Sequence, residues 1–196
     1  MGRYKLTIQY DGSSFFGWQL QKNERTVQGE IEKGIQIISQ SSNRITLHGA
    51  GRTDTGVHAR AQVAHVDLET RLNIKELKNA LNGNIDKDCR IMDIEKIHDD
   101  FQARFDAKKR YYKYQCYVGE SILYHNQAWI GSNLNLDCLN ELASQIVGDH
   151  DFLSFSKFRE DMKNTRCLIY KSEWKSEGKM VIFRIVGNRF LHHMVR

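Results

Sequence analysis

One short loop holds the residues whose types and spacing are best suited to chemistry. The segment GAGRTDTGVHA, residues 49–59, places three glycines around Arg52 and Asp54. Glycine permits positive φ angles and a close approach of the backbone to a ligand, so this loop can present one carboxylate with a guanidinium two residues away. A nearby cation favours an ionised carboxylate, and an ionised carboxylate is a nucleophile. The segment therefore predicts a catalytic loop centred on Asp54.

Two other interpretations of this loop stay open beside the catalytic one. In the first, the loop is a tight surface turn in which Asp54 caps local amides. In the second, the Asp-Thr-Gly sequence at 54–56 belongs to an aspartic protease. A protease needs two carboxylates that share one proton in an apolar cradle, whereas Arg52 would hold Asp54 ionised. The local sequence therefore argues against the protease.

The composition excludes several classes of protein. With 196 residues, 40% hydrophobic and 27% charged, the chain is an ordinary globular one, which excludes wholesale disorder and fibrous repeats. Its apolar runs, such as residues 180–183, are far too short to span a membrane, and no signal peptide precedes the first expected strand. We therefore expect a cytoplasmic protein with no membrane partner.

Charge and metal-ligating residues narrow the choice of partners. The net charge of +5 favours a polyanionic partner. The 4 cysteines are widely spaced, and the 8 histidines form no pattern typical of metal ligands. No motif for a nucleotide or redox cofactor is present. We therefore expect no metal site and no small-molecule cofactor.

Hydrophobic periodicity predicts the elements that position the loop. Alternating apolar residues predict strands, and apolar residues at helical spacing predict helices. The expected strands cover residues 3–10, 45–48, 59–68, 90–97, 111–118, 165–175 and 179–186. The expected helices follow the capping residues Thr26 and Asn73, cover 137–147 and begin again in the last segment, 188–196, with Phe190 over Met194. This mixture predicts an α+β fold with helices on one face of a sheet.

Five motifs, in order along nearly the whole chain, resemble those of the tRNA pseudouridine synthase A family. The loop is similar to the active-site pattern of that family, G-R-T-D-x-G-V-H. The other four motifs are YDGSSFFGWQ at 10–19, FQARFDAKKRYYKY at 101–114, HDFLSF at 150–155 and GNRFLHHMVR at 187–196. A single match would carry little weight, whereas five in order are specific.

The resemblance implies a pseudouridine synthase fold. In that α+β fold, two ferredoxin-like halves share a mixed central sheet with helices packed on it, and the active-site cleft lies between the halves. We expect residues 1–100 to form the N-terminal half with the catalytic loop, and residues 101–196 to form the second half. Family members continue past the last motif with a further strand, so we expect the second half to be C-terminally truncated.

The resemblance also implies the reaction. Family members isomerise uridine to pseudouridine at positions thirty-eight to forty of the tRNA anticodon stem-loop, and the motif makes Asp54 the nucleophile. Asp54 attacks either the ribose carbon or carbon 6 of the ring, after which the uracil detaches, rotates and rejoins through carbon 5. The isomerisation needs no metal or cofactor. The implied partners are tRNA and a second copy of the chain in a homodimer.

Further residues take roles from the same resemblance. Arg52 interacts with the RNA as the target base flips out of the helix. Tyr112 stacks against the uracil, and strand alternation places it on one face with Tyr114. Arg196 lies close to the catalytic aspartate. The RNA-contacting residues are Phe101, Gln102, Ala103, Arg104 and Phe105, together with Arg110.

A non-catalytic RNA-binding module is the alternative function. Such a module would keep the basic surface and lack turnover. The position of Asp54 argues against this alternative, because an anion facing phosphates costs affinity.

Overall fold

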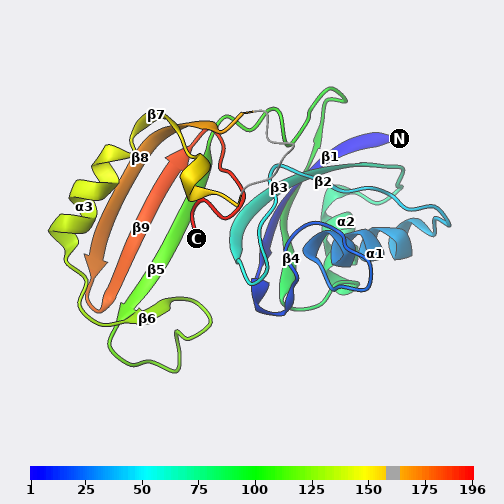
Figure 1. Cartoon of the computed structure of the whole chain (residues 1–196). Helices are drawn as coiled ribbons and strands as arrows, with labels where there is room; N and C mark the ends of the chain where they lie inside the picture. Colours follow the sequence, from blue (N-terminus) through cyan, green and yellow to red (C-terminus); the bar gives the residue numbers. More distant parts are fainter. Residues whose placement is uncertain (158–163) are drawn as a thin grey trace. The chain divides into compact units, whose positions relative to one another are not determined.

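The computed structural model describes residues 1–157 and 164–196, and its contacts divide the chain into two units. Unit 1 is Met1–Ala107 and unit 2 is Lys108–Arg196. Each unit contains its own β-sheet (Figure 1). Strand pairing among the described residues forms two sheets, so the expected single shared sheet is corrected. Both neighbours of β1 are strands of unit 1, and both neighbours of β9 are strands of unit 2.

The sheet of unit 1 is built around its first strand. β1 pairs antiparallel with β3 on one side and with β4 on the other, and the strand order is β2-β3-β1-β4. Alternate residues of β1 are buried, as the pattern at 3–10 predicts. The strands are β1 (Gly2–Tyr10), β2 (His48–Gly49), β3 (Ala59–Leu68) and β4 (Cys89–Ile97).

Two amphipathic helices contribute apolar side chains to the core of unit 1. They are α1 (Val27–Ser39) and α2 (Ile74–Gly83), which lie side by side (Figure 1). Each begins where the sequence predicts: Thr26 accepts a hydrogen bond from the Gly29 amide, and Asn73 forms a capping box with Glu76. Their inward side chains join the buried residues of β1, β3 and β4 in one core.

The sheet of unit 2 has the strand order β6-β5-β9-β8-β7. β9 pairs antiparallel with β5 and β8, whereas the short β6 pairs parallel with β5. Helix α3 packs against β8. The sequence predicts the hairpin but neither β6 nor β7. The elements are β5 (Arg110–Val118), β6 (Trp129–Gly131), α3 (Leu136–Gln145), β7 (Gly148–Asp151), β8 (Arg166–Glu177) and β9 (Met180–Gly187), and two 3-10 turns lie at Gly12–Ser14 and Leu153–Phe155.

The expected strand at 45–48 is wrong for most of its length, since β2 consists of His48–Gly49 alone. The reason lies in the backbone of Leu47. Its amide donates to the carboxylate of Glu32 at 2.8 Å, and its carbonyl accepts from the side chain of Gln28 at 3.1 Å. Two side chains of α1 thus occupy the groups that a sheet ladder would use.

The expected helix at the last segment is also wrong. The residues after β9 form turns, in which the amide of Met194 donates to the carbonyl of Leu191 and the amide of Arg196 to that of His193. His193 has a φ of 65°, in the left-handed region. A residue in that conformation interrupts the hydrogen-bond pattern of an α-helix.

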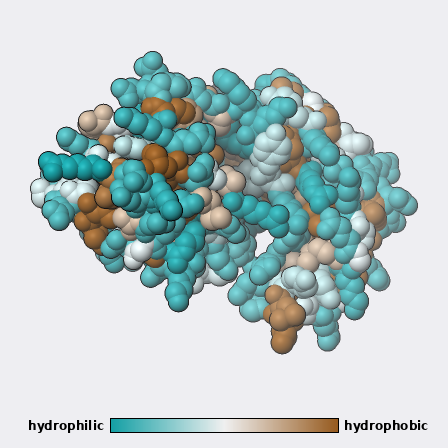
Figure 2. Space-filling view, turned by 180° about the vertical axis from the view of Figure 1, so that it is seen from behind, coloured by the Kyte–Doolittle hydropathy of each residue, from teal (hydrophilic) through white to brown (hydrophobic). Residues whose placement is uncertain are grey.

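The surface is mainly hydrophilic, with hydrophobic residues in separate patches (Figure 2). Among the exposed apolar side chains are Ile122 and Leu123, in the loop between β5 and β6. Among the described residues, no helix has the length and apolar character needed to cross a membrane.

Helix α1 offers a direct test of the core of unit 1. Ile35 is 0% exposed and Ile37 on the same helix is 50% exposed. We expect Ile35→Ala to lower the free energy of unfolding of unit 1 by about 2–5 kcal/mol, because it removes buried methyl groups and leaves a cavity. Ile37→Ala is the matched control, with an effect of about 0.5 kcal/mol or less. Chemical denaturation of both variants measures the difference, and equal effects would contradict the assigned helix face.

Candidate active site

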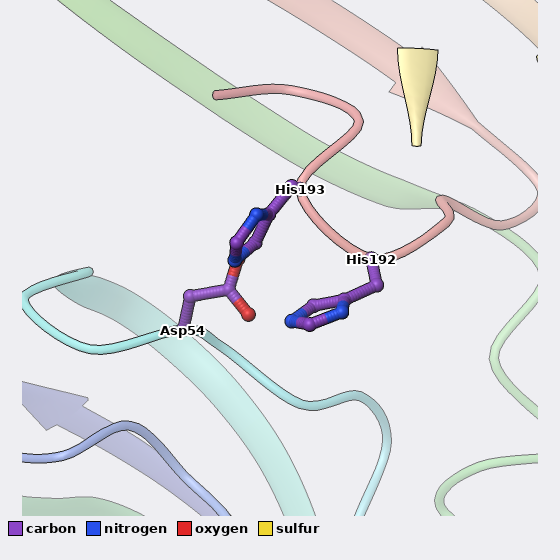
Figure 3. Close-up of side chains that lie close together, drawn as sticks. All are labelled: Asp54, His192 and His193. Carbon is purple, nitrogen blue, oxygen red and sulfur yellow. The ribbon is translucent and has the colours of Figure 1, made fainter. Parts of the chain in front are cut away.

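The glycine-rich loop joins β2 to β3, and its backbone separates from β3 soon after β2 ends. The Ala50 amide still donates to the Val63 carbonyl at 2.8 Å, and the side chain of Gln62 donates to the Gly51 carbonyl at 2.9 Å. Beyond these bonds the backbone departs from the ladder until β3 begins. Asp54 lies half-buried in this loop (Figure 3).

The segment after β1 holds the loop in position. The Trp18 amide donates to the Thr53 carbonyl at 3.0 Å, and the hydroxyls of Tyr10 and Thr53 are hydrogen-bonded at 2.8 Å. Further along the loop, the Gly56 amide donates to the Phe15 carbonyl at 3.3 Å. The residue immediately before the candidate nucleophile is therefore fixed through both its backbone and its side chain.

Two glycines allow this close approach. Gly17 has a φ of +84°, and a Cβ atom there would lie 2.6 Å from the Thr53 carbonyl oxygen. A Cβ atom on Gly12 would lie 2.2 Å from the carbonyl oxygen of Val57. No larger residue fits at either position without a shift of the backbone.

The loop closes on itself and on the end of β1. The Val57 amide donates to the Asp54 carbonyl at 3.2 Å, so Asp54 begins a turn. The Gly12 amide donates to Nδ1 of His58 at 3.1 Å, and the same imidazole faces the Asp11 carboxylate at 3.1 Å. Hydrogen bonds from Ser13 hold the pKa of Asp11 below its ordinary value, and His58 adds a smaller effect in the same direction.

An arginine anchors the outer side of the same segment. The guanidinium of Arg25 lies over the ring of Phe15, 4.1 Å from its centroid. It also forms ion pairs with Asp88 at 2.6 Å and Asp86 at 3.0 Å. The hydrogen bond from Arg25 holds the pKa of Asp88 below its ordinary value. The segment that supports the loop is thereby tied to the start of β4.

Arg52 and the expected RNA-contacting stretch occupy exposed positions of unit 1. Arg52 is exposed on the loop. In the stretch at 101–105, Ala103 is 2% exposed, whereas Phe105 is 74% exposed and carries the guanidinium of Arg104 5.6 Å from its ring centroid. Phe101 is half-buried and Gln102 is exposed. Ala103 thus anchors the stretch, and an arginine and an aromatic ring project together.

In unit 2, Tyr112 is the third residue of β5. It is half-buried on the same face as Tyr114, whereas Tyr111 and Lys113 are exposed, which confirms the predicted alternation. The ring of Tyr112 meets that of Phe190 edge to face, with centroids 4.9 Å apart. The contact with Phe190 therefore restricts the orientation of the Tyr112 ring.

Arg110 has a structural contact. Its guanidinium donates to the Asn188 carbonyl at 2.6 Å, and the side chain of Asn188 accepts from the Leu168 amide at 2.9 Å. The bond joins β5 to the segment that follows β9. At least one nitrogen of Arg110 is therefore used within the fold.

The other residues of the last motif lie in the turn after β9. His192 and His193 are exposed there, with ring centroids 4.1 Å apart (Figure 3). Arg196 is exposed and acts on Tyr114: burial raises the pKa of Tyr114, and the positive charge of Arg196 partly opposes that rise.

Sequence reasoning missed the residues that hold the loop. The bond between Tyr10 and Thr53 joins positions 43 apart in sequence, so no local pattern predicts it. Gly12 and Gly17 were available as a signal, because glycine permits a close approach of the backbone to another segment. Their partner, however, is visible only in the folded chain.

Comparison with known proteins adds independent evidence. A family described as tRNA pseudouridine synthase matches residues 6–106 and 142–196. A relative named tRNA pseudouridine synthase A, from Borrelia turicatae (strain 91E135), is 40% identical over 203 residues, which span 100% of this chain and 80% of the relative. Another of that name, from Brucella ovis (strain ATCC 25840 / 63/290 / NCTC 10512), is 37% identical over 202 residues, with the same coverage.

Gly17 tests how the loop is held. We expect Gly17→Ala to lower the free energy of unfolding by about 1–3 kcal/mol, because the new methyl group meets the Thr53 carbonyl in a left-handed conformation. Gly83→Ala is the control, since a Cβ atom there meets nothing within 4 Å. Thermal denaturation compares the two, and amide exchange at Trp18 reports the loop contact. An unchanged exchange rate at Trp18 in Gly17→Ala would contradict the assigned approach.

Proposed function

Because the chain belongs to the tRNA pseudouridine synthase family, we propose that it acts on uridines thirty-eight to forty of the tRNA anticodon stem-loop with Asp54 as the nucleophile. Membership of the family makes the chain an isomerase of tRNA. The observation that carries the proposal is the loop itself: its single carboxylate follows a residue that Tyr10 and Trp18 fix in place. A surface turn whose aspartate only caps amides does not need that support.

The chemistry needs a positioned carboxylate and little else. Asp54 adds to the uridine, the bond between the ribose and ring nitrogen 1 breaks, and the uracil turns. A bond then forms between the ribose and carbon 5, and the bond to Asp54 breaks to restore the carboxylate. Carbon 5 loses its proton, and nitrogen 1 gains one. The product has the same atoms as the substrate, so no oxidant, reductant or group donor enters. Covalent attachment at Asp54 holds whichever part of the nucleotide it has attacked, the ribose or the base, while the ring turns.

Arg52 is proposed to hold the RNA when the target base leaves the stack. Unstacking and unpairing a base cost a few kcal/mol, so a group that occupies the vacated space lowers that cost. Arg52 is exposed, two residues before the nucleophile on the same loop. Its planar guanidinium can stack on bases or bind phosphate.

Tyr112 is proposed to bind the uracil. Arg196 is proposed to support the charge of the nucleophile. The packing of Phe190 against Tyr112 favours a fixed ring that stacks on a base, since stacking is strongest when neither ring loses freedom on binding. Arg196 is exposed and carries a permanent positive charge, as an interaction with a carboxylate or a phosphate requires.

The stretch at 101–105 and Arg110 are proposed to contact the RNA. Phe105 and Arg104 offer an aromatic face and a cation together, the combination that binds single-stranded bases and phosphates. Arg110 adds a positive charge at the start of β5, and such a charge attracts the phosphates of the RNA backbone. These contacts supply affinity and not the choice of uridine.

Three broader features belong to the same proposal: ferredoxin-like halves, a homodimer and a cytoplasmic location. In unit 1 the elements run β-α-β-β-α-β with the order β2-β3-β1-β4, which supports the proposal of a ferredoxin-like half. In unit 2, β5, α3, β8 and β9 follow the first part of that arrangement. A homodimer would let two subunits grip one anticodon arm, and the tRNA substrate supports a cytoplasmic location.

Asp54→Asn tests the nucleophile. With tRNA labelled with tritium at carbon 5 of uridine, we expect the unchanged chain to release tritium and Asp54→Asn to release more than about a thousandfold less, because an amide cannot form the covalent bond. Filter binding should show that the variant still binds tRNA. Asp93→Asn, an exposed carboxylate on β4, is the matched control. Binding without release by the unchanged chain would favour the RNA-binding module instead.

Substituted tRNA tests the position of the target. Transcripts in which the uridines at thirty-eight, thirty-nine and forty are changed to cytidine, singly and together, should release progressively less tritium, and the triple change should release none. Where the uridine is paired, its partner is changed to guanosine, which restores a Watson–Crick pair, so a loss of release reports the missing target and not a disrupted helix. Full release from the triple change would place the modified uridine elsewhere in the tRNA.

A further inference from the structure

The RNA-contacting stretch belongs to a short folded segment, residues 98–106. The Phe101 amide donates to the His98 carbonyl at 3.1 Å, and the amides of Phe105 and Asp106 both donate to the Gln102 carbonyl, at 3.0 and 2.9 Å. The carboxylate of Asp106 accepts from the Gln102 amide at 2.7 Å. These bonds lie within the segment, so they do not attach it to the sheet of unit 1.

One attachment is a buried histidine on β3. His65 is 2% exposed, and its Nδ1 atom accepts a hydrogen bond from the Ala103 amide at 3.2 Å. Ala103 is equally buried, so its amide is shielded from water and is hydrogen-bonded to the imidazole instead. The bond joins residues 38 apart in sequence, and it falls in the middle of the expected RNA-contacting stretch.

A second attachment lies beside the first. Arg3 on β1 donates to the carbonyls of Asp99 and Phe101, and its guanidinium pairs with both oxygens of Asp67, each at 2.7 Å. The ring of His65 also meets the ring of Phe101, with centroids 6.0 Å apart. The carbonyl and amide groups of the segment are thus bound by two different side chains of the sheet.

We propose that His65 is a positioning residue that holds the segment at 98–106 so that Arg104 and Phe105 face the tRNA, and that it does so only as the neutral imidazole. Nδ1 acts as an acceptor, so the proton of the neutral ring sits on Nε2. A second proton would occupy the lone pair that receives the Ala103 amide and would turn that bond into a repulsion between two donors. The proposal rests on the proposed function, since it presumes that the stretch contacts RNA.

The surroundings of His65 keep its ring neutral. Burial lowers the pKa of His65, and the charges of His48 and Arg3 lower it further. The ring of His48 on β2 stacks on His65, with centroids 4.9 Å apart. Asp67 and Asp106 act in the opposite direction and are the weaker influences. A histidine with a lowered pKa binds fewer protons in the folded state than in the unfolded state, whose pKa is about 6.5. Its contribution to stability is therefore complete above about pH 6.5 and is lost as the pH falls toward the lowered value.

Two substitutions separate positioning from general folding. His65→Leu keeps an apolar ring-sized volume and removes the acceptor, whereas His65→Gln supplies an amide oxygen that accepts a hydrogen bond and never takes up a proton. We expect amide exchange at Ala103 to be at least about tenfold faster in His65→Leu and to return toward the original rate in His65→Gln. His125→Leu, at an exposed histidine of unit 2, is the control and should leave the Ala103 rate unchanged.

Binding and turnover of tRNA complete the test. In His65→Leu we expect the KM for tRNA to rise about tenfold with a smaller change in kcat, because the substitution disturbs binding and leaves the loop of Asp54 intact. As the pH falls through the lowered pKa of His65, the unchanged chain should lose tRNA affinity together with Ala103 protection, and His65→Gln should lack this coupled loss.

The outcomes are distinguishable. Unchanged Ala103 exchange in His65→Leu would overturn the positioning role. Faster exchange with unchanged tRNA affinity would overturn the link to RNA, and it would locate the failure in the RNA-contacting role of residues 101–105. An equal loss of Ala103 protection in His65→Gln and His65→Leu, with no rescue, would show that only ring packing matters and would also overturn the proposal.

Discussion

The contact between the chain after β1 and the loop before β3 is the constraint on which the candidate site depends. Thr53 is held by the Trp18 amide and the Tyr10 hydroxyl, and that contact is possible only because Gly17 has no side chain. A carboxylate that attacks carbon must meet its target in a narrow range of distance and angle. The position of Asp54 is therefore set by residues that lie far from it in sequence.

That contact is itself supported by a buried polar network on α1. Gln28 accepts from the Leu20 amide, and Glu32 accepts from the Leu47 amide and from Arg44. Buried polar groups cost free energy unless every one is hydrogen-bonded, and here the partners include backbone amides from the chain before the helix and from the chain after it. The same helix thus fixes the chain just after the Trp18 contact and the chain just before β2. Apolar packing gives unit 1 its core, and these polar contacts determine where its loops lie.

The sequence predicts local features of this fold and misses those that depend on distant partners. The capped start of α1 after Thr26 and the full extent of β3 follow from local patterns, because capping and alternation act within a few residues. The strand at 45–48 failed because Leu47 bonds to side chains of α1, and the final helix failed because His193 adopts a left-handed conformation. In the site, glycines and a carboxylate marked the loop, but the bond between Tyr10 and Thr53 could not be predicted from either residue alone.

Two kinds of support thus serve two different tasks in unit 1. The loop of Asp54 is held mainly by backbone bonds and close glycine contacts, with an imidazole contact from His58 at its end. The segment of Phe105 is attached through side chains, which are the imidazole of His65 and the guanidinium of Arg3. In the proposed function, backbone bonds keep the carboxylate of the nucleophile at a fixed distance and angle to its target. The segment of Phe105 would instead present a cation and an aromatic ring to the RNA, so attachment through side chains is enough to orient it.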